Sequence, residues 1–317
     1  SFELWNSTKP FAGLFIPKKN INPILITNHL NLKKVSKISK SFHIFKEEKF
    51  IKYLKSSKLK NIETSYEFLN LNMYMRLSNF LNVSETKINI SKYMGIKTSK
   101  EIKNIESCHI EDGLAVLKFI IELKQKKINP KNEHEVSEIL YNKRKEGINF
   151  FRNSFDYISA FDSNAAIVHY KPHSEKSLSS KNKNLLLIDS GAQYLEGTTD
   201  ITRVIKIGAK NLSRVKFSYT YLLKSLIRIE NKIFPRNIRT SEIDLFIRKY
   251  LSKFNITYNH GTGHGVGNFG DVHEKYPIIS SRSNDILVKN ALFSIEPGYY
   301  VEGQFGLRIE NLYVTKN

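Results

Sequence analysis

The sequence predicts an α+β protein, with a smaller α/β region ahead of a larger part in which helices alternate with mixed strands. Three observations lead to this prediction: apolar residues recur at helical spacing, short apolar runs typical of strands lie between those segments, and glycine-rich turns join the runs. With 317 residues, the chain is long enough for two domains and at least one large core. Its 40% hydrophobic and 25% charged residues are typical of a soluble globular protein.

Charge and cysteine content narrow the classes of partner. The net charge is +20, but the lysines are scattered and form no Arg-rich tract or RNA-binding motif, so we expect no nucleic-acid partner. No apolar run reaches the roughly 20 residues of a membrane span, and no secretory leader opens the chain, so we expect no membrane partner. Cys108 is the single cysteine and fits a small core residue in a reducing cytoplasm.

The first 97 residues read as an α/β layer unit. Short apolar runs such as residues 23–27 alternate with Lys-rich segments, and the spacing predicts helices over 47–58 and 71–81. We therefore expect a first domain over residues 1–97 and a second over 98–317.

The second domain is predicted to begin with a helix. Thr98 and Glu101 have the spacing of a capping box. The apolar stripe expected to face the core follows them as Ile102, Ile105, Leu114, Leu117 and Ile121.

Three further helices and five strands complete the expected second domain. Helices are predicted over 133–146, over 212–234 before Pro235, and from Ser241 to about 254, with Asp244 at capping distance. The predicted strands cover residues 165–169, 185–189, 199–207, 292–295 and 307–314.

Acidic residues stand at the ends of two predicted hairpins. Asp189 and Asp200 lie in LIDSGAQYLEGTTDITR, at the end of one strand and the start of the next. Glu296 in EPGYY and Glu310 in GLRIEN repeat the arrangement around a Pro-Gly turn. Two such hairpins side by side would direct four carboxylates to one point, where burial without cations would be costly.

A histidine in a glycine-rich turn completes the set. His264 lies in HGTGHGVG, residues 260–267, where glycines allow the backbone to approach a ligand closely. Four carboxylates and one imidazole suit a pair of divalent metal ions, because hard oxygen ligands bind Mg, Mn or Zn and their charge offsets two dications.

These motifs resemble those of the aminopeptidase P enzymes, the Xaa-Pro aminopeptidases of the pita-bread metallopeptidase family. They are closer to the cytosolic type than to methionine aminopeptidases. The resemblance runs from about Thr98 to the end and implies a pita-bread domain, C-terminally short, preceded by a partial creatinase-like domain. It implies a cytoplasmic hydrolase, with two divalent ions, Mn before Zn or Co, that removes the N-terminal residue from peptides with proline second.

The resemblance also assigns roles. It implies that the metal ligands are Asp189, Asp200, His264, Glu296 and Glu310, that Asp200 and Glu310 bridge both ions, and that Asp189 helps to receive the free amino group. Glu296 is expected to carry the proton.

Three further histidines match family positions that contact the substrate. His273 is expected to contact the scissile carbonyl or oxyanion, His169 the carbonyl of the substrate proline, and His260 the wall of the proline pocket. Arg308 is a predicted partner of a ligand carboxylate.

Two other functions share these motifs. A prolidase, which cuts only Xaa-Pro dipeptides, has the same five ligands and would leave a tripeptide untouched. A truncated, inactive pita-bread module would be a binding protein rather than an enzyme. A homodimer is a further expectation from the resemblance.

Overall fold

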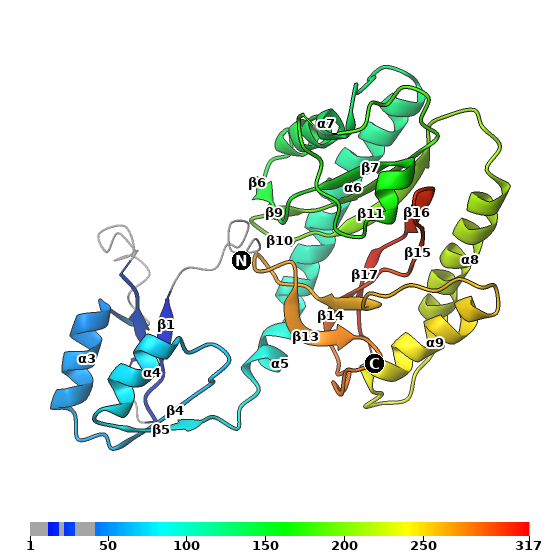
Figure 1. Cartoon of the computed structure of the whole chain (residues 1–317). Helices are drawn as coiled ribbons and strands as arrows, with labels where there is room; N and C mark the ends of the chain where they lie inside the picture. Colours follow the sequence, from blue (N-terminus) through cyan, green and yellow to red (C-terminus); the bar gives the residue numbers. More distant parts are fainter. Residues whose placement is uncertain (1–11, 19–21, 29–41, 176, 317) are drawn as a thin grey trace. The chain divides into compact units, whose positions relative to one another are not determined.

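The computed structural model describes residues 12–18, 22–28, 42–175 and 177–316. The chain divides into two compact units, Lys9–Ile90 and a unit that takes in Ser91–Asn317 (Figure 1). Parts of the predicted first domain, residues 1–11, 19–21 and 29–41, lie outside the described residues. The domain boundary at residues 97 and 98 stays a prediction. No helix in the described part of the chain is long and apolar enough to cross a membrane.

The N-terminal unit has two small sheets and two helices. Its first sheet has the order β1 (Gly13–Phe15), β2 (Ile24–Ile26), β3 (His43–Phe45), with β2 and β3 parallel. The chain continues through α3 (Glu47–Ser56), β4 (Asn61–Thr64), α4 (Leu71–Ser78) and β5 (Asn82–Glu85), and β4 pairs parallel with β5. Both predicted helices are confirmed.

One face of each helix builds the core of this unit. The buried residues of this core are Ile24, Phe50, Ile51, Leu54, Met73, Leu77 and Leu81.

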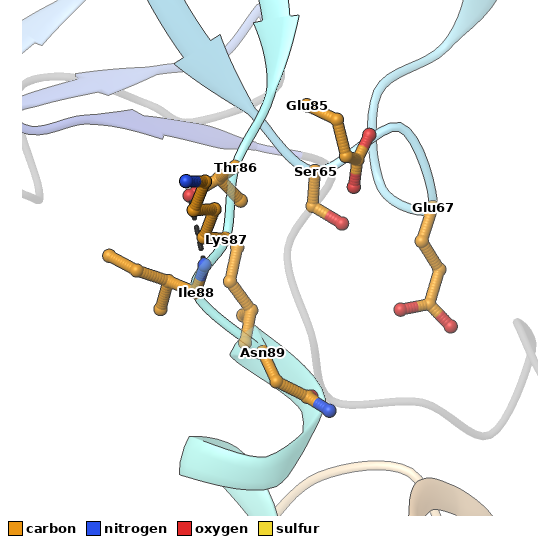
Figure 2. A pocket seen from close by; sticks show the side chains of 8 residues that line it. Ser65, Glu67, Glu85, Thr86, Lys87, Ile88 and Asn89 are labelled. Atoms are coloured by element: carbon orange, nitrogen blue, oxygen red, sulfur yellow. Dashed lines mark hydrogen bonds between the residues drawn. The ribbon is translucent and has the colours of Figure 1, made fainter.

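A polar hollow of about 250 Å³ opens at the carboxyl ends of β4 and β5 (Figure 2). Glu85 on its wall already accepts a hydrogen bond from the Tyr66 backbone N–H at 2.8 Å.

The second unit begins with a helical pair over antiparallel strands. The elements are α5 (Ile90–Gly95), α6 (Ser99–Lys124), α7 (Glu133–Lys145), β6 (Phe150–Asn153), β7 (Ile158–Phe161), the 3₁₀ turn η1 (Asp162–Ala166), β8 (Leu185–Ser190), β9 (Ala192–Tyr194), β10 (Gly197–Thr198) and β11 (Ile201–Lys206). They form the sheets β11-β8-β7 and β10-β9-β6. The capping box at Thr98 is confirmed, because Thr98 Oγ1 accepts from Glu101 N at 3.2 Å and Glu101 Oε2 accepts from Thr98 N at 2.7 Å.

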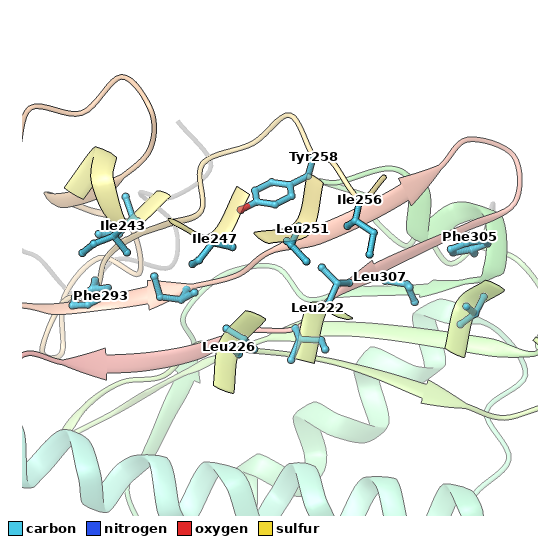
Figure 3. Packing of buried hydrophobic residues seen from close by; sticks show 14 of the residues in the cluster. Leu222, Leu226, Ile243, Ile247, Leu251, Ile256, Tyr258, Phe293, Phe305 and Leu307 are labelled. Atoms are coloured by element: carbon cyan, nitrogen blue, oxygen red, sulfur yellow. The ribbon is translucent and has the colours of Figure 1, made fainter. Parts of the chain in front are cut away.

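The rest of this unit repeats the plan of a helical pair beside a sheet (Figure 1). The elements are α8 (Ser213–Glu230), α9 (Thr240–Ser252), β12 (Gly263–Gly265), β13 (Glu274–Ile279), β14 (Leu292–Ile295), β15 (Gly298–Val301), β16 (Phe305–Arg308) and β17 (Asn311–Val314). The sheet order is β13-β12-β14-β17, with β15 and β16 paired separately. Apolar residues of α8 and α9 meet those of β14 and β16 in the largest core cluster (Figure 3).

Three predictions about local structure are wrong. Residues 165–169 form no strand: Asp162 has a positive φ of 40°, and its carboxylate accepts from the backbone N–H groups of Asn184 and Leu185, which holds the chain in η1. The predicted strand 307–314 is two strands, β16 and β17. Asp244 does not cap α9; the N-terminal contact is from Arg239 N to Glu242 Oε1 at 3.3 Å.

The apolar stripe predicted on α6 is also largely wrong. Leu114, Leu117 and Ile121 are 54%, 50% and 43% exposed, whereas the buried face of α6 is centred on Asp112. Apolar periodicity missed this face because a charged residue lies in its middle. Cys108 is buried on the same face, as predicted.

Asp112 is buried because Arg144 of α7 neutralises it. Arg144 Nε donates to Asp112 Oδ1 at 2.7 Å and Arg144 Nη2 to Oδ2 at 2.9 Å, and neither residue is more than 2% exposed. Tyr194 Oη donates to the same carboxylate at 3.0 Å, and the guanidinium lies 4.9 Å from the Tyr157 ring centroid. The pair therefore joins both helices to the strands that follow Asp189.

Replacing Arg144 should destabilise this unit strongly. Arg144→Leu leaves the Asp112 charge buried without a partner, so we expect the free energy of unfolding to fall by about 3–5 kcal/mol. Lys145→Leu, at the adjacent exposed position of α7, should change it by about 0.5 kcal/mol or less. Urea denaturation followed by circular dichroism measures both, and equal losses in the two variants would contradict the assigned role.

Candidate metal centre

Two antiparallel strand pairs bring the four candidate carboxylates together. In the first pair, β8 and β11, Ser190 lies opposite Ile201, so Asp189 and Asp200 stand at the same end of the ladder. In the second, β14 and β17, Ile295 lies opposite Asn311, which places Glu296 and Glu310 beside each other just beyond the ladder. The hairpin of β15 and β16 is inserted between them, so the second pair is not the simple hairpin that the sequence predicted.

The central imidazole comes from β12, between β13 and β14. His264 Nε2 lies 3.6 Å from Asp200 Oδ2, 3.6 Å from Glu296 Oε1 and 4.0 Å from Glu310 Oε1. Ligand atoms of Asp189, Asp200 and Glu310 also lie within 4.8 Å of one another. All five residues predicted as metal ligands therefore meet at one place.

Glycines on both sides of His264 permit this approach. A Cβ on Gly263 would lie 1.8 Å from the Ser294 carbonyl oxygen, and one on Gly265 would lie 2.1 Å from the Tyr276 carbonyl oxygen. Any larger residue would push β12 away from β14 or β13. The glycine spacing in HGTGHGVG is thus explained by packing within the sheet.

Burial makes the charge of these carboxylates costly. Removal from water, together with the neighbouring carboxylates, holds the pKa of Asp200 and of Glu310 well above the usual range. Burial raises the pKa of Glu296 to about 8, although Arg308 opposes the shift. Burial and then His273 lower the pKa of His264 to about 3, so its imidazole is neutral.

The centre contains more hydrogen-bond acceptors than donors. His264 Nδ1 lies 3.0 Å from the Gly265 carbonyl oxygen and so carries the proton, which leaves the lone pair of Nε2 facing carboxylate oxygens. Asp189 Oδ1, Asp200 Oδ1 and Glu310 Oε1 are buried and have no hydrogen-bond partner. Oxygen and imidazole acceptors aimed at one another fit divalent cations between them.

One side of the centre is held by Arg308 and Tyr300. Arg308 Nη2 donates to Asp189 Oδ2 at 2.6 Å, so the predicted contact with a candidate ligand is confirmed, and Nη1 donates to Tyr300 Oη at 2.9 Å. Tyr300 Oη in turn lies 2.9 Å from His260 Nε2. A continuous chain of polar contacts therefore runs from Asp189 to His260.

The other predicted histidines differ in exposure and in their contacts with the centre. The rings of His273 and His264 are 4.1 Å apart, and His273 also belongs to a group with Asp200. His169 is exposed in the segment after η1. Burial lowers the pKa of His260 to about 4, with smaller contributions from Arg308, Arg248 and His169. His260 is therefore neutral at neutral pH.

Sequence reasoning missed the polar residues that hold this framework. Thr202 Oγ1 donates to Glu310 Oε2 at 2.8 Å, and Tyr300 links Arg308 to His260 as described above. Asp244 accepts from Arg248 Nε at 2.9 Å, and Arg248 Nη2 donates to the His260 carbonyl oxygen at 2.6 Å. Only Thr202, two residues after Asp200 in the predicted strand 199–207, had a detectable signal, because side chains two apart on a strand share a face.

Comparison with known proteins places the chain in a family. Residues 104–317 match the model of metallopeptidase family M24. The chain belongs to this family. The curated relatives it resembles include a protein of Sordaria macrospora named "Probable Xaa-Pro aminopeptidase P", which is 38% identical over 241 residues. That match covers 74% of this chain and 39% of the relative.

A second curated match is longer. A protein of the same name from Neurospora crassa is 33% identical over 327 residues, which covers 98% of this chain and 46% of the relative. This M24 chain therefore spans less than half the length of the curated relatives it matches.

Solved structures confirm the predicted pita-bread fold. The X-prolyl aminopeptidase of Caenorhabditis elegans, described as a cytosolic enzyme with a di-nuclear active site, has a TM-score of 0.83 at 25% identity and covers 98% of this chain and 52% of its own. The Xaa-Pro dipeptidase of Bacillus anthracis has a TM-score of 0.82 at 25% identity, with 98% and 86% covered.

The glycines beside His264 should tolerate no side chain. We expect Gly265→Ala to lower the free energy of unfolding by about 2 kcal/mol or more, because the new Cβ meets backbone rather than a flexible side chain. Gly113→Ala on α6 is the matched control: its Cβ meets nothing within 4 Å, and alanine should stabilise the helix by about 0.5–1 kcal/mol. Urea denaturation of both variants measures the contrast, and a neutral Gly265→Ala would refute the packing argument.

Glu296 should make the metal-free protein sensitive to pH. Its raised pKa means that the folded state favours the protonated carboxyl, so the stability contributed by that group is present below about pH 4.5 and is lost as pH rises to about 8. In excess EDTA, Glu296→Gln should therefore equal the wild type at pH 5 and exceed its unfolding free energy at pH 8. A variant less stable than the wild type at pH 8 would contradict this expectation, because it would mean that other groups in the folded protein stabilise the ionised Glu296 carboxylate.

Proposed function

We propose that this M24 chain is a di-metal Xaa-Pro aminopeptidase, which hydrolyses the bond between the N-terminal residue of a peptide and a proline in second place. The observation that carries the proposal is the convergence of buried carboxylates with unpartnered oxygens on a neutral imidazole. Relatives named Xaa-Pro aminopeptidase P, and a neighbour with a di-nuclear active site, support the substrate class and the metal count.

Five residues are the proposed ligands. Asp189, Asp200, Glu296 and Glu310 would supply carboxylate oxygens and His264 an imidazole nitrogen to hold two divalent ions. Two divalent ions in this site would polarise the scissile carbonyl and lower the pKa of a water molecule. Mn is our first choice, with Zn or Co as alternatives, because all three accept oxygen and imidazole ligands.

The chain's own residues would handle the substrate and the proton. Glu296 takes a proton from the attacking water and delivers it to the proline nitrogen as the C–N bond breaks. His273, whose ring lies beside that of His264, donates to the oxyanion that forms on the scissile carbonyl. His169 contacts the proline carbonyl, His260 lines the proline pocket, and Asp189 receives the free amino group.

Prolidase is the second candidate, favoured by one observation. The dipeptidase of Bacillus anthracis matches the fold as well as the aminopeptidase of Caenorhabditis elegans does, with TM-scores of 0.82 and 0.83.

A cytoplasmic location is part of our proposal and is supported by the single buried cysteine. The homodimer stays a prediction.

The deciding assay uses the purified chain with excess Mn and the tripeptide Ala-Pro-Ala. We expect release of free alanine, and Glu296→Gln should lower the rate by about 10²–10⁴-fold because the proton carrier is lost. Glu302→Gln, the same change at an exposed turn position, should leave the rate within about twofold. Amino-acid analysis of the products measures the release.

Other outcomes identify the alternatives. Cleavage of Ala-Pro with Ala-Pro-Ala left intact would indicate a prolidase. A folded, metal-loaded chain that cuts neither peptide would indicate a binding module without catalytic activity.

A further inference from the structure

Glu133 is a fully buried carboxylate with no place in the proposed chemistry. It is the first residue of α7, 0% exposed, and follows the N-cap Asn132. The N-terminus of a helix favours negative charge there. Its side chain points away from the helix into the segment that joins β7 to β8.

Five hydrogen bonds from that segment end on this one carboxylate. Phe161 N donates to Oε1 at 2.7 Å, and Asn164 Nδ2 donates to both oxygens at 3.1 and 3.0 Å. Tyr170 Oη and Leu178 N donate to Oε2 at 2.7 and 2.8 Å. All of these donors are uncharged, and they extend from Phe161 at the end of β7 to Leu178.

The backbone at the start of α7 holds the far end of the same segment. Glu133 N donates to the Leu178 carbonyl oxygen at 3.3 Å, and Ser180 N donates to the Lys131 carbonyl oxygen at 2.9 Å. The start of α7 is therefore hydrogen-bonded both to the beginning of the segment between β7 and β8 and to its later part.

The opposite side of the segment lies against the candidate centre. A Cβ on Gly306 of β16 would lie 1.7 Å from the Ala165 carbonyl oxygen, so η1 and β16 are in backbone contact two residues from Arg308. His169 is the third residue after η1 and lies directly before Tyr170, and it is one of the residues that lower the pKa of His260. Glu133 is thus connected to His169 through one adjacent residue.

We propose that Glu133 is a positioning residue that fixes the segment carrying His169, and thereby sets the proline-side specificity of the enzyme. The inference rests on the proposed function, because it takes His169 as the contact to the substrate proline. Glu133 touches neither substrate nor metal in this scheme. Its role is to hold the imidazole where the proline carbonyl will lie.

A carboxylate suits this role better than an amide. Both of its oxygens only accept hydrogen bonds, and here they accept from N–H and O–H groups on every side. In Glu133→Gln, one oxygen becomes an NH₂ group that faces donors. Segment 161–170 should then lose its fixed position although the side-chain volume is unchanged.

The first test compares kinetics with Ala-Pro-Ala. Glu133→Gln should raise KM by about tenfold while kcat stays within about twofold, because the His169 contact contributes binding rather than chemistry. Tyr170→Phe removes one of the five hydrogen bonds and should raise KM by a smaller factor, so it tests the idea even if Glu133→Gln folds poorly. Glu135→Gln, the same change two residues along α7, should leave KM unchanged, since the Glu135 side chain accepts a hydrogen bond from Lys131 N rather than from the segment that carries His169.

The second test asks whether Glu133 acts through His169. In a His169→Ala background, Glu133→Gln should add no further rise in KM, because the contact it positions is already lost. A full additional rise would overturn the proposal, as would an unchanged KM in the single variant.

Hydrogen–deuterium exchange gives a readout that does not depend on activity. Peptides covering residues 161–170 should exchange faster in Glu133→Gln than in the wild type, while peptides covering 185–190 should not. Unchanged exchange in 161–170 would overturn the anchoring role. If the wild-type chain cleaves no peptide, the proposed function fails, and this exchange result still decides whether Glu133 anchors the segment.

Discussion

Mutual repulsion among clustered carboxylates, three of them buried, is the constraint on which the rest of this structure depends. Asp189, Asp200, Glu296 and Glu310 share one small volume, and the guanidinium of Arg308 pairs with only the first of them. Three carboxylate oxygens there have no donor, although buried polar atoms are normally paired. The strand pairs and their hydrogen bonds hold these carboxylates together despite their repulsion. Such an arrangement fits a site in which cations offset the negative charge.

Two buried carboxylates outside the centre show how the same fold satisfies acidic groups permanently. Asp112 is neutralised by Arg144 and also accepts from Tyr194, and Glu133 accepts five hydrogen bonds from four uncharged donors. Neither Asp112 nor Glu133 has an unpartnered oxygen, whereas three of the four carboxylates at the centre have one.

Close backbone packing sets the geometry around His264. Gly263 and Gly265 let β12 lie against both of its neighbours, and the β14 backbone is tied to the loop before β12 through Glu296 N and Thr262 O at 2.8 Å. Asp244 and Arg248 then hold the carbonyl of His260. The imidazole that faces the carboxylates and the one that faces Tyr300 are therefore positioned by one connected framework.

The sequence by itself determined the α+β class, the approximate bounds of most helices and the set of residues that meet at the centre, because local periodicity, the Thr98 capping box and the turn motifs are written in adjacent residues. Whether those residues bind metal stays a proposal. Only the tertiary structure decided which face of α6 is buried, that residues 165–169 turn rather than extend, and that Tyr300 links Arg308 to His260. Each of these depends on partners far along the chain, such as Arg144 for Asp112 and Gly306 for Ala165, and no local pattern encodes a contact between distant segments.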